Sequence, residues 1–330
     1  MNILLVGAGA VGQVYGLYLQ RGGANVTFWV KEKYVAEARS GYTVYPLNRK
    51  KATRWEPVRF DGFGVISSAD EIEPGAYDAV ILCVSSTQLR APWLDELAGR
   101  LGSSTLVMLQ PGLDDRSYVS ERIDEGQIVG GVITVVSYQT PLPGESTDPP
   151  GVAFWYPPLA AAPFSGPAER VEPLLETFRR GHMPVKRIDD VTAMAGFPNA
   201  ILTPHLVALE AAGWTFAELR RSGALKLASR AVTEAMKIVA RQKGVSRPVA
   251  RVAVRPSTMS TLLRLAKWVI PFDFEVYLEY HFTKVGDQTR FFMSRYIELG
   301  REYGIGVASL VELQNSLDAA TAPKELAPAS

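Results

Sequence analysis

The feature that most constrains the fold of this chain is a glycine-rich turn at its N-terminus. Residues 2–6 (NILLV) form a short apolar run that is typical of a buried parallel strand. A helical pattern follows the turn and continues to Gly22, so the turn stands between a strand and a helix, as a βαβ unit requires. The turn matches the pattern G-x-G-x-x-G, and its candidate binding residues are Gly7, Gly9, Ala10, Val11 and Gly12.

A turn of this kind binds the pyrophosphate of a dinucleotide, and each glycine has a separate physical reason. Gly7 permits the tight turn, and Gly9 lets backbone N–H groups approach the phosphates. Gly12 lets the helix pack closely on the sheet. The alternative is a purely structural glycine turn in an α/β protein. The strand before the turn and the helix after it favour the dinucleotide.

Charges after the second β-rich run, residues 25–30, indicate which dinucleotide is bound. An acidic residue here is typical of NAD, whereas a cation suits the 2′-phosphate of NADP. Lys31 and Lys33 flank Glu32, so the local charge is positive and we expect NADP. The alternative is a solvated helix start, which Glu32 stabilises through the helix dipole.

Strand and helix patterns alternate through the first half of the chain. Further β-rich runs cover residues 42–47, 57–60, 64–67, 79–84, 105–109, 127–138 and 152–156. Helical patterns cover residues 33–40 and 87–101. This alternation predicts a Rossmann-type parallel sheet with helices on both faces.

The second half of the chain has long amphipathic patterns in place of strands. They cover residues 169–179, 191–212, 214–243, 248–267 and 273–303, and they predict an all-α domain. We therefore expect a dinucleotide-binding Rossmann-like domain over residues 1–175 and a helical substrate and dimerisation domain over residues 176–318. Residues 319–330 are predicted to form a flexible tail.

Composition argues against several other classes of protein. Among 330 residues, 35 Lys+Arg nearly balance 34 Asp+Glu, which argues against a dedicated nucleic-acid binder. Cys83 is the single cysteine and the three histidines lie far apart, so no metal site is expected. The sequence contains no apolar stretch of about 18 residues, which argues against a membrane span. The N-terminus lacks a signal-peptide pattern, and we expect a cytoplasmic protein.

Motifs along nearly the whole chain resemble the ketopantoate reductase (2-dehydropantoate 2-reductase) family. In the first half they are GAGAVG at 7–12, SSTQ at 85–88, LQPGL at 109–113 and GGV at 130–132. In the second half they are NAILTP at 199–204, EAMKIVARQKG at 234–244, PSTM at 256–259 and a segment at 300–304. The later motifs are individually much weaker than the first.

The resemblance implies a Rossmann domain that binds NADP, followed by a helical domain, in an arrangement like that of 6-phosphogluconate dehydrogenase. Members of the family reduce the ketone of a 2-keto acid by hydride transfer; a lysine donates the proton, and asparagines and a serine hold the substrate. Carried over to this chain, the resemblance implies cofactor contacts from Ser85, Gln110 and Pro111. It implies substrate contacts from Asn199, Ser257, Thr258 and Gln288, with Asn199 also a catalytic residue.

The chain departs from the family pattern at four positions. The family lysine four residues before Asn199 is Ala195 here, and the lysine after the strand at 79–84 is Ser85. Pro111 replaces the asparagine of LQNGL, and Gln288 replaces an acidic residue. Hydride addition to a carbonyl creates an alkoxide, and removing one donor to such a charge typically costs about 10²–10³ in rate. We therefore expect a substrate other than ketopantoate.

Lys284 is the candidate for the missing proton donor. It lies four residues before Gln288, one helical turn away in the pattern at 273–303, and His281 lies on the same face. The alternative is a solvated lysine that pairs with Asp287 or Glu279.

Three functions remain open from the sequence. The first is an NADP-dependent oxidoreductase that transfers a hydride between NADPH and a ketone or imine. An imine would partly explain the lost acid, since a protonated iminium becomes a neutral amine on hydride addition. The second is a non-catalytic NADP-binding sensor or regulatory protein, and the third is a ketopantoate reductase with a rebuilt site. A homodimer through the helical half is a further expectation.

Overall fold

The chain forms two compact units, Met1–Ala195 and Gly196–Ser330. A computed structural model describes residues 1–245 and 255–321 of it. The division lies later than the boundary expected at 175/176, because the strand Val185–Arg187 still pairs with the sheet of the first unit. Part of the predicted helix at 248–267, and residues 322–330 of the predicted tail, lie outside the described residues.

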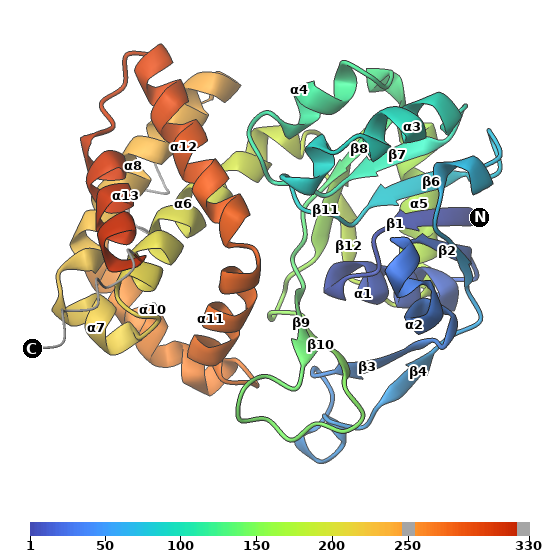
Figure 1. Cartoon of the computed structure of the whole chain (residues 1–330), viewed down its shortest axis with the longest axis horizontal. Coiled ribbons are helices and arrows are strands. Elements are labelled where there is room, and N and C mark those ends of the chain that lie inside the picture. The colour runs from blue at the N-terminus through green and yellow to red at the C-terminus, as the bar shows by residue number, and fades with distance from the viewer. Residues whose placement is uncertain (246–254, 322–330) are drawn as a thin grey trace, which may run out of the picture. The chain divides into compact units, whose positions relative to one another are not determined.

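An eight-stranded sheet forms the centre of the first unit (Figure 1). Its order is β12-β11-β8-β7-β6-β1-β2-β5. Its strands are β1 (Asn2–Val6), β2 (Asn25–Trp29), β5 (Gly64–Ile66), β6 (Ala79–Leu82), β7 (Thr105–Met108), β8 (Ile128–Gly131), β11 (Ala162–Ser165) and β12 (Val185–Arg187). Neighbouring strands are parallel except β11 and β8, which are antiparallel. The parallel sheet predicted from the alternating patterns is confirmed.

Side chains of β1 show how this sheet is buried on both faces. Ile3 and Leu5 belong to one core cluster and Leu4 and Val6 to the other. The first cluster includes residues of α1 (Ala10–Arg21) and α5 (Ala168–Arg180), and the second includes residues of α3 (Trp93–Arg100) and α4 (Asp115–Ser120). A strand buried on both sides reads as a continuous apolar run, which explains the pattern NILLV.

A second sheet of four strands, which the sequence patterns did not predict, also belongs to the first unit. Its order is β4-β3-β10-β9. The strands are β3 (Tyr42–Pro46), β4 (Val58–Phe60), β9 (Val136–Thr140) and β10 (Gly151–Trp155). The single β-rich segment predicted at 127–138 is therefore wrong, because β8 and β9 lie in different sheets.

Several short helices complete the first unit. They are α2 (Val35–Arg39) and five 3₁₀ turns, η1 (Glu32–Tyr34), η2 (Lys51–Thr53), η3 (Ala69–Glu71), η4 (Gln88–Arg90) and η5 (Glu125–Gln127). The helical patterns predicted at 33–40 and 87–101 are thus each divided between a 3₁₀ turn and an α-helix.

The described residues of the second unit are helical, which confirms the all-α class. Its helices are α6 (Thr192–Ala211), α7 (Phe216–Arg221), α8 (Ala224–Lys243), α10 (Pro256–Val269), α11 (Phe274–Lys284), α12 (Gly286–Glu302) and α13 (Ala308–Thr321). Helix α8 contacts α7, α10, α12 and α13, and buries Ala228, Ala231 and Val232 completely. The predicted tail is corrected at 319–321, which continue α13.

Two of the predicted long helices are interrupted in the structure. The pattern at 214–243 divides at Gly223, whose φ of +81° lies in the left-handed region. The pattern at 273–303 divides at Val285, whose φ of −115° and ψ of 27° are not helical. Apolar periodicity continues across both interruptions, so the pattern alone did not reveal them.

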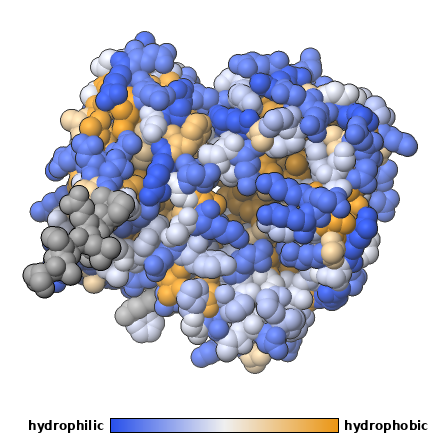
Figure 2. Space-filling view, viewed as in Figure 1, coloured by the Kyte–Doolittle hydropathy of each residue, from blue (hydrophilic) through white to orange (hydrophobic). Residues whose placement is uncertain are grey.

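The exterior is mixed in character. On the face shown in Figure 2, hydrophilic residues predominate and apolar residues appear in smaller separate areas. Among the described residues, no helix combines the length and hydropathy that a bilayer span needs. The described residues also contain no group of three or more His, Cys, Asp or Glu that could hold a metal ion.

Candidate cofactor site

The turn between β1 and α1 has the backbone geometry that its three glycines were expected to provide. Gly7 has φ +99°, and a Cβ there would lie 3.0 Å from the Cys83 carbonyl oxygen. A Cβ on Gly12 would lie 2.2 Å from the Gly7 carbonyl oxygen, so α1 packs against the turn only with glycine at that position. Gly9 is exposed, and a Cβ there would meet no atom within 4 Å. This open side is where backbone N–H groups are accessible to a phosphate.

The N-terminus of α1 is suited to an anion. Gly9 is the N-cap and provides no side-chain hydrogen bond to the helix, and the first turn contains no acidic residue. Ala10 and Val11 are half-buried. Because unpaired N–H groups and the helix dipole attract negative charge, these residues fit the pyrophosphate of a dinucleotide.

Gln13 stabilises this turn, and no pattern in the sequence indicated this role. Its side chain is 4% exposed and donates from Nε2 to the Ala8 carbonyl oxygen at 2.9 Å, while its backbone N–H donates to Gly9. The amide thus fixes the backbone between the first two glycines.

The segment after β2 presents cations to solvent. Lys31, Glu32 and Lys33 are all exposed. Lys31 is the N-cap of η1, and the Lys33 ammonium lies 4.8 Å from the centre of the Tyr34 ring. Tyr34 is itself 45% exposed, so this segment combines positive charge with an accessible aromatic face.

Loops after β6 and β7 contain the remaining cofactor residues that the resemblance implied. The Ser85 hydroxyl lies 2.9 Å from that of Thr87 and accepts from the Gln88 backbone N–H. Gln110 donates from Nε2 to the carbonyl oxygens of Leu82 and Val84, both at 2.9 Å. The Gln110 side chain therefore ties the end of β7 to the end of β6.

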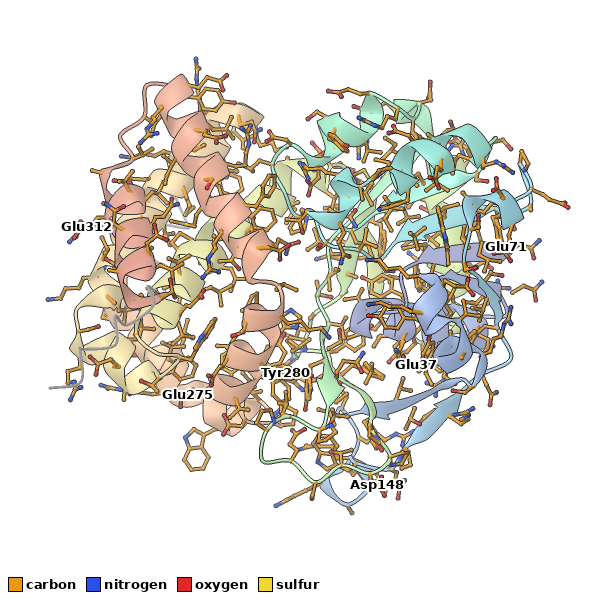
Figure 3. All side chains as sticks on the ribbon, viewed as in Figure 1. Glu37, Glu71, Asp148, Glu275, Tyr280 and Glu312 are labelled. Atoms are coloured by element: carbon orange, nitrogen blue, oxygen red, sulfur yellow. The ribbon has the colours of Figure 1, made fainter. Side chains whose placement is uncertain are left out.

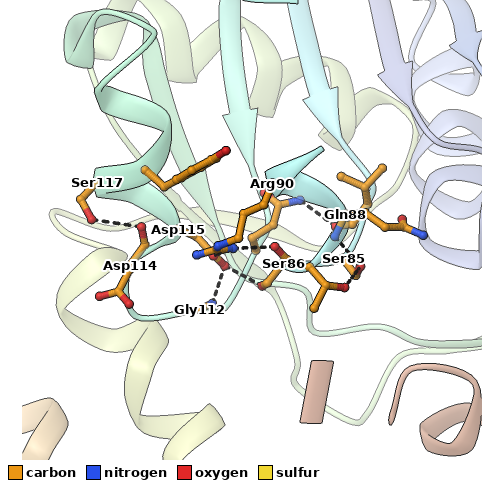
Figure 4. Close-up of polar contacts among 12 residues, drawn as sticks. Ser85, Ser86, Gln88, Arg90, Gly112, Asp114, Asp115 and Ser117 are labelled. Atoms are coloured by element: carbon orange, nitrogen blue, oxygen red, sulfur yellow. Dashed lines mark hydrogen bonds and ion pairs between the residues drawn. The ribbon is translucent and has the colours of Figure 1, made fainter. Parts of the chain in front are cut away.

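Asp115 is the centre of a buried polar cluster between these two loops (Figure 4). Its side chain is 1% exposed and accepts hydrogen bonds from the Ser86 hydroxyl at 2.6 Å and the Gly112 backbone N–H at 2.8 Å. Arg90 forms an ion pair with it at 2.9 Å and donates to the Ser86 carbonyl oxygen at 2.5 Å. The Arg90 guanidinium also lies 5.0 Å from the centre of the Tyr118 ring. No sequence pattern indicated Arg90 or Asp115 as a site residue.

Gly112 and Cys83 show how closely these loops are packed. A Cβ on Gly112 would lie 2.3 Å from a carboxylate oxygen of Asp115, so the cluster requires glycine there. Burial raises the pKa of the Cys83 thiol to about 12. The thiol therefore stays protonated near neutral pH and is not a nucleophile.

Asn199 is the substrate contact that the resemblance implies in the second unit. Its side chain lies beside the hydroxyls of Thr203 and Tyr296, and both of these residues are buried. It is 8% exposed, and its Oδ1 accepts from the Thr203 hydroxyl at 3.0 Å. Its amide nitrogen is buried without a hydrogen-bond partner among the described residues. Burial raises the pKa of the Tyr296 hydroxyl, and the nearby Asn199 side chain partly offsets this increase.

The helix break at Val285 separates Lys284 from Gln288. Lys284 is exposed at the last residue of α11, whereas Gln288 is half-buried in the first turn of α12. The prediction that both lie one turn apart on a continuous helix is therefore wrong. Ser257 and Thr258 lie in the first turn of α10, Ser257 exposed and Thr258 half-buried.

Helix α11 has a stacked ring pair beside Lys284, in which Tyr277 is buried and His281 is half-buried. His281 stacks on Tyr277 with ring centres 5.3 Å apart, and burial together with the charge of Lys284 lowers the pKa of His281 to about 4. Glu275 and Tyr280 come from the same helix (Figure 3), and the Glu275 carboxylate accepts from the Phe216 backbone N–H. The ring of His281 is therefore neutral near pH 7.

Comparisons with known proteins agree with this architecture. Residues 3–147 match the family model described as ketopantoate reductase PanE/ApbA. No curated protein matches the sequence. Many solved structures are similar over nearly the whole chain.

Three of the similar structures illustrate the match. A PanE/ApbA family ketopantoate reductase from Ralstonia eutropha JMP134 is 16% identical, with a TM-score of 0.74 over 97% of this chain and 98% of that one. The 2-dehydropantoate 2-reductase from Geobacter metallireducens GS-15 is 20% identical, with a TM-score of 0.69 over 97% and 100%. D-mandelate dehydrogenase, solved with NADH and anilino(oxo)acetate, is 15% identical, with a TM-score of 0.69 over 97% and 98%.

The family match covers the glycine-rich turn and the loops after β6 and β7, and the structural likenesses extend the fold to the helical unit. This confirms the resemblance seen in the motifs. Residues 3–147 therefore match the ketopantoate reductase family model, and the whole chain shares its fold with solved structures described as ketopantoate reductases.

Proposed function

We propose that this protein is an NADP-dependent oxidoreductase whose substrate is a small ketone or imine other than ketopantoate. The turn at Gly7, Gly9 and Gly12 carries the proposal, because its open side and uncapped helix fit a pyrophosphate. The exposed Lys31 and Lys33 support NADP, since cations suit a 2′-phosphate. Bound NADPH would supply the hydride.

The departures from the family pattern support a different substrate. Ala195 and Ser85 stand where family members carry lysines, so neither position provides a cation. We propose that Lys284 supplies the proton or a cation for the substrate. Its exposure and its position beside the neutral ring of His281 are compatible with that role.

The experiment that tests this function measures NADPH oxidation with a panel of substrates, by loss of the absorbance of the reduced nicotinamide. The panel contains ketopantoate, aromatic and aliphatic 2-keto acids, and cyclic imines. We expect turnover of at least one compound and slow or no turnover of ketopantoate. Ketopantoate turnover at an ordinary enzymatic rate, on the order of 1–10³ per second, would overturn the proposed substrate class.

Variants of Lys284 test the proton donor. Lys284→Ala is expected to lower kcat for a ketone by about 10²–10⁴, the usual effect of losing a general acid. The matched control is Lys226→Ala, which removes another exposed lysine of the helical unit. Equal activity of the two variants would remove Lys284 from the proposal.

A second candidate is a non-catalytic NADP-binding protein. The observation that favours it is the loss of both lysines together with an intact glycine-rich turn. It predicts NADPH binding without turnover of any ketone or imine. The same substrate panel, combined with a titration of NADPH fluorescence, distinguishes it from the oxidoreductase.

A further inference from the structure

We propose that Asp115 is a positioning residue that holds the loops after β6 and β7 as a platform for the nicotinamide half of the cofactor. This inference rests on the proposed function, since it assumes that the first unit binds NADP. It concerns a carboxylate that contacts neither the glycine-rich turn nor the lysines after β2 in any interaction described above.

The location of the cluster follows from the topology of the sheet. In a doubly wound sheet, a dinucleotide lies across the carboxyl ends of the strands at the point where the strand order reverses. Here β1 continues to β2 on one side, and β6 pairs with β1 on the other. The glycine-rich turn and the lysines follow β1 and β2. The loops that Asp115 joins follow β6 and β7, so they belong to the opposite half of the sheet.

The contacts of Asp115 explain how it fixes both loops. One carboxylate accepts from the Gly112 backbone, which belongs to the loop after β7, and from the Ser86 hydroxyl, which belongs to the loop after β6. Arg90 neutralises the carboxylate and donates to the Ser86 backbone as well. The backbone of both loops is therefore held by a single buried acceptor.

A separate pair of hydrogen bonds already holds the ends of β6 and β7 together, so the Asp115 cluster is not needed for that purpose alone. Gln110 already joins the ends of β6 and β7 through the carbonyl oxygens of Leu82 and Val84. Asp115 acts further along the chain, where the backbone leaves the sheet at Gly112 and Ser86. A buried ion pair is weak evidence for stability, because desolvation offsets much of the attraction. We infer that the Asp115–Arg90 pair sets the conformation of the two loops.

The test uses Asp115→Asn and two ligands that differ only in the nicotinamide. One ligand is NADPH, and the other is 2′-phospho-ADP-ribose, which keeps the adenine and lacks the nicotinamide. Asparagine keeps the size of the side chain and directs an N–H₂ group at the donors around it, so at least one buried donor loses its acceptor. Such a loss typically costs about 1–3 kcal/mol. We expect NADPH to bind about tenfold or more weakly, while the affinity for 2′-phospho-ADP-ribose stays within about twofold.

The matched control is Asp95→Asn. Asp95 also pairs with an arginine, Arg122, at 2.8 Å, and that guanidinium lies 4.1 Å from the centre of the same Tyr118 ring. Because Asp95 is 68% exposed and contacts neither loop in the interactions described, this variant should bind both ligands as the wild type does. Ser86→Ala is the second test variant, and it removes one donor to Asp115. It should also weaken the binding of NADPH selectively, by a smaller factor than Asp115→Asn.

Three results would overturn the inference and leave the proposed function standing. Equal weakening of both ligands in Asp115→Asn would indicate a merely structural residue. Unchanged NADPH affinity in both Asp115→Asn and Ser86→Ala would indicate that the loops do not need the cluster. If the wild-type protein binds 2′-phospho-ADP-ribose but gains nothing from the nicotinamide, no platform exists. A wild-type protein that binds neither ligand would instead contradict the proposed function itself, and the inference with it.

Discussion

At the scale of single residues, Gly9 and Gly12 lie in the same turn but have opposite surroundings. A methyl group on Gly12 would clash with the backbone at Gly7, whereas one on Gly9 would enter open space. Gly9 has φ −67°, which alanine adopts freely, so stability does not require glycine at this position. Gly12 is therefore required for packing, whereas Gly9 is required only if a ligand approaches the turn.

This difference gives a paired prediction. Gly12→Ala should lower the free energy of unfolding by about 1–3 kcal/mol, the usual cost of overpacking. Gly9→Ala should change stability by a few tenths of a kcal/mol only. It should nevertheless weaken NADPH binding about tenfold, since a hydrogen bond to a charged group is worth about 1.5–3 kcal/mol. Thermal unfolding and NADPH titration of both variants check this, and equal stability of the two would contradict the packing argument.

His281 gives a prediction on pH dependence. Its pKa is about 4 in the folded protein, lowered by burial and by Lys284, against an ordinary value of 6.5. The unfolded chain therefore binds a proton that the folded chain does not, and stability falls as pH drops from about 6.5 towards 4. Between about pH 7.5 and pH 5 the loss due to this group is about 2 kcal/mol.

The measurement compares wild type with His281→Gln by urea denaturation at both pH values, followed by circular dichroism. The variant should lose about 2 kcal/mol less than the wild type over this interval, because its side chain does not titrate. Other groups contribute equally to both proteins and cancel in the comparison. Identical pH profiles would show that His281 is hydrated in the folded state.

At the scale of elements, we expect the segment after β2 to determine which nucleotide is preferred. Lys31 and Lys33 are exposed like charges that repel each other weakly through solvent, and an anion bound nearby would attract both. Replacing both with glutamate should raise the Kd for NADPH about tenfold or more and leave the Kd for NADH nearly unchanged. Fluorescence titrations at low salt measure both constants. An equal loss of NADH affinity would indicate that the lysines support the fold of η1 and do not bind the 2′-phosphate of NADPH.

Elements also set the limits of the sequence patterns in the helical unit. Apolar periodicity over 273–303 was continuous, and the structure interrupts it at Val285, which placed Lys284 and Gln288 on different helices. The apolar periodicity continues across such a helix break when both helices bury an apolar face in the same unit. The proposed pairing of two side chains by spacing alone therefore failed at this point.

At the scale of the whole molecule, we expect the stability of the two compact units to depend differently on the proposed cofactor. The glycine-rich turn and the loops after β6 and β7 lie wholly within Met1–Ala195. We expect two unfolding transitions in calorimetry, because each unit buries an apolar core of its own. NADPH at about 100 times its Kd should stabilise one transition by about 2.7 kcal/mol and leave the other nearly unchanged. A single transition that shifts as a whole would indicate that the units unfold cooperatively.

The sequence by itself determined the class of fold and the position of the glycine-rich turn. Both depend on local rules: a strand buried on both faces is uniformly apolar, and a tight turn before a helix needs glycines at fixed spacing. Only the tertiary structure brought Asp115 to Ser86, 29 residues away, and divided β8 and β9 between two sheets. Contacts between distant segments leave no local periodicity in the chain, because a buried charge and its donors are matched only after the strands have paired.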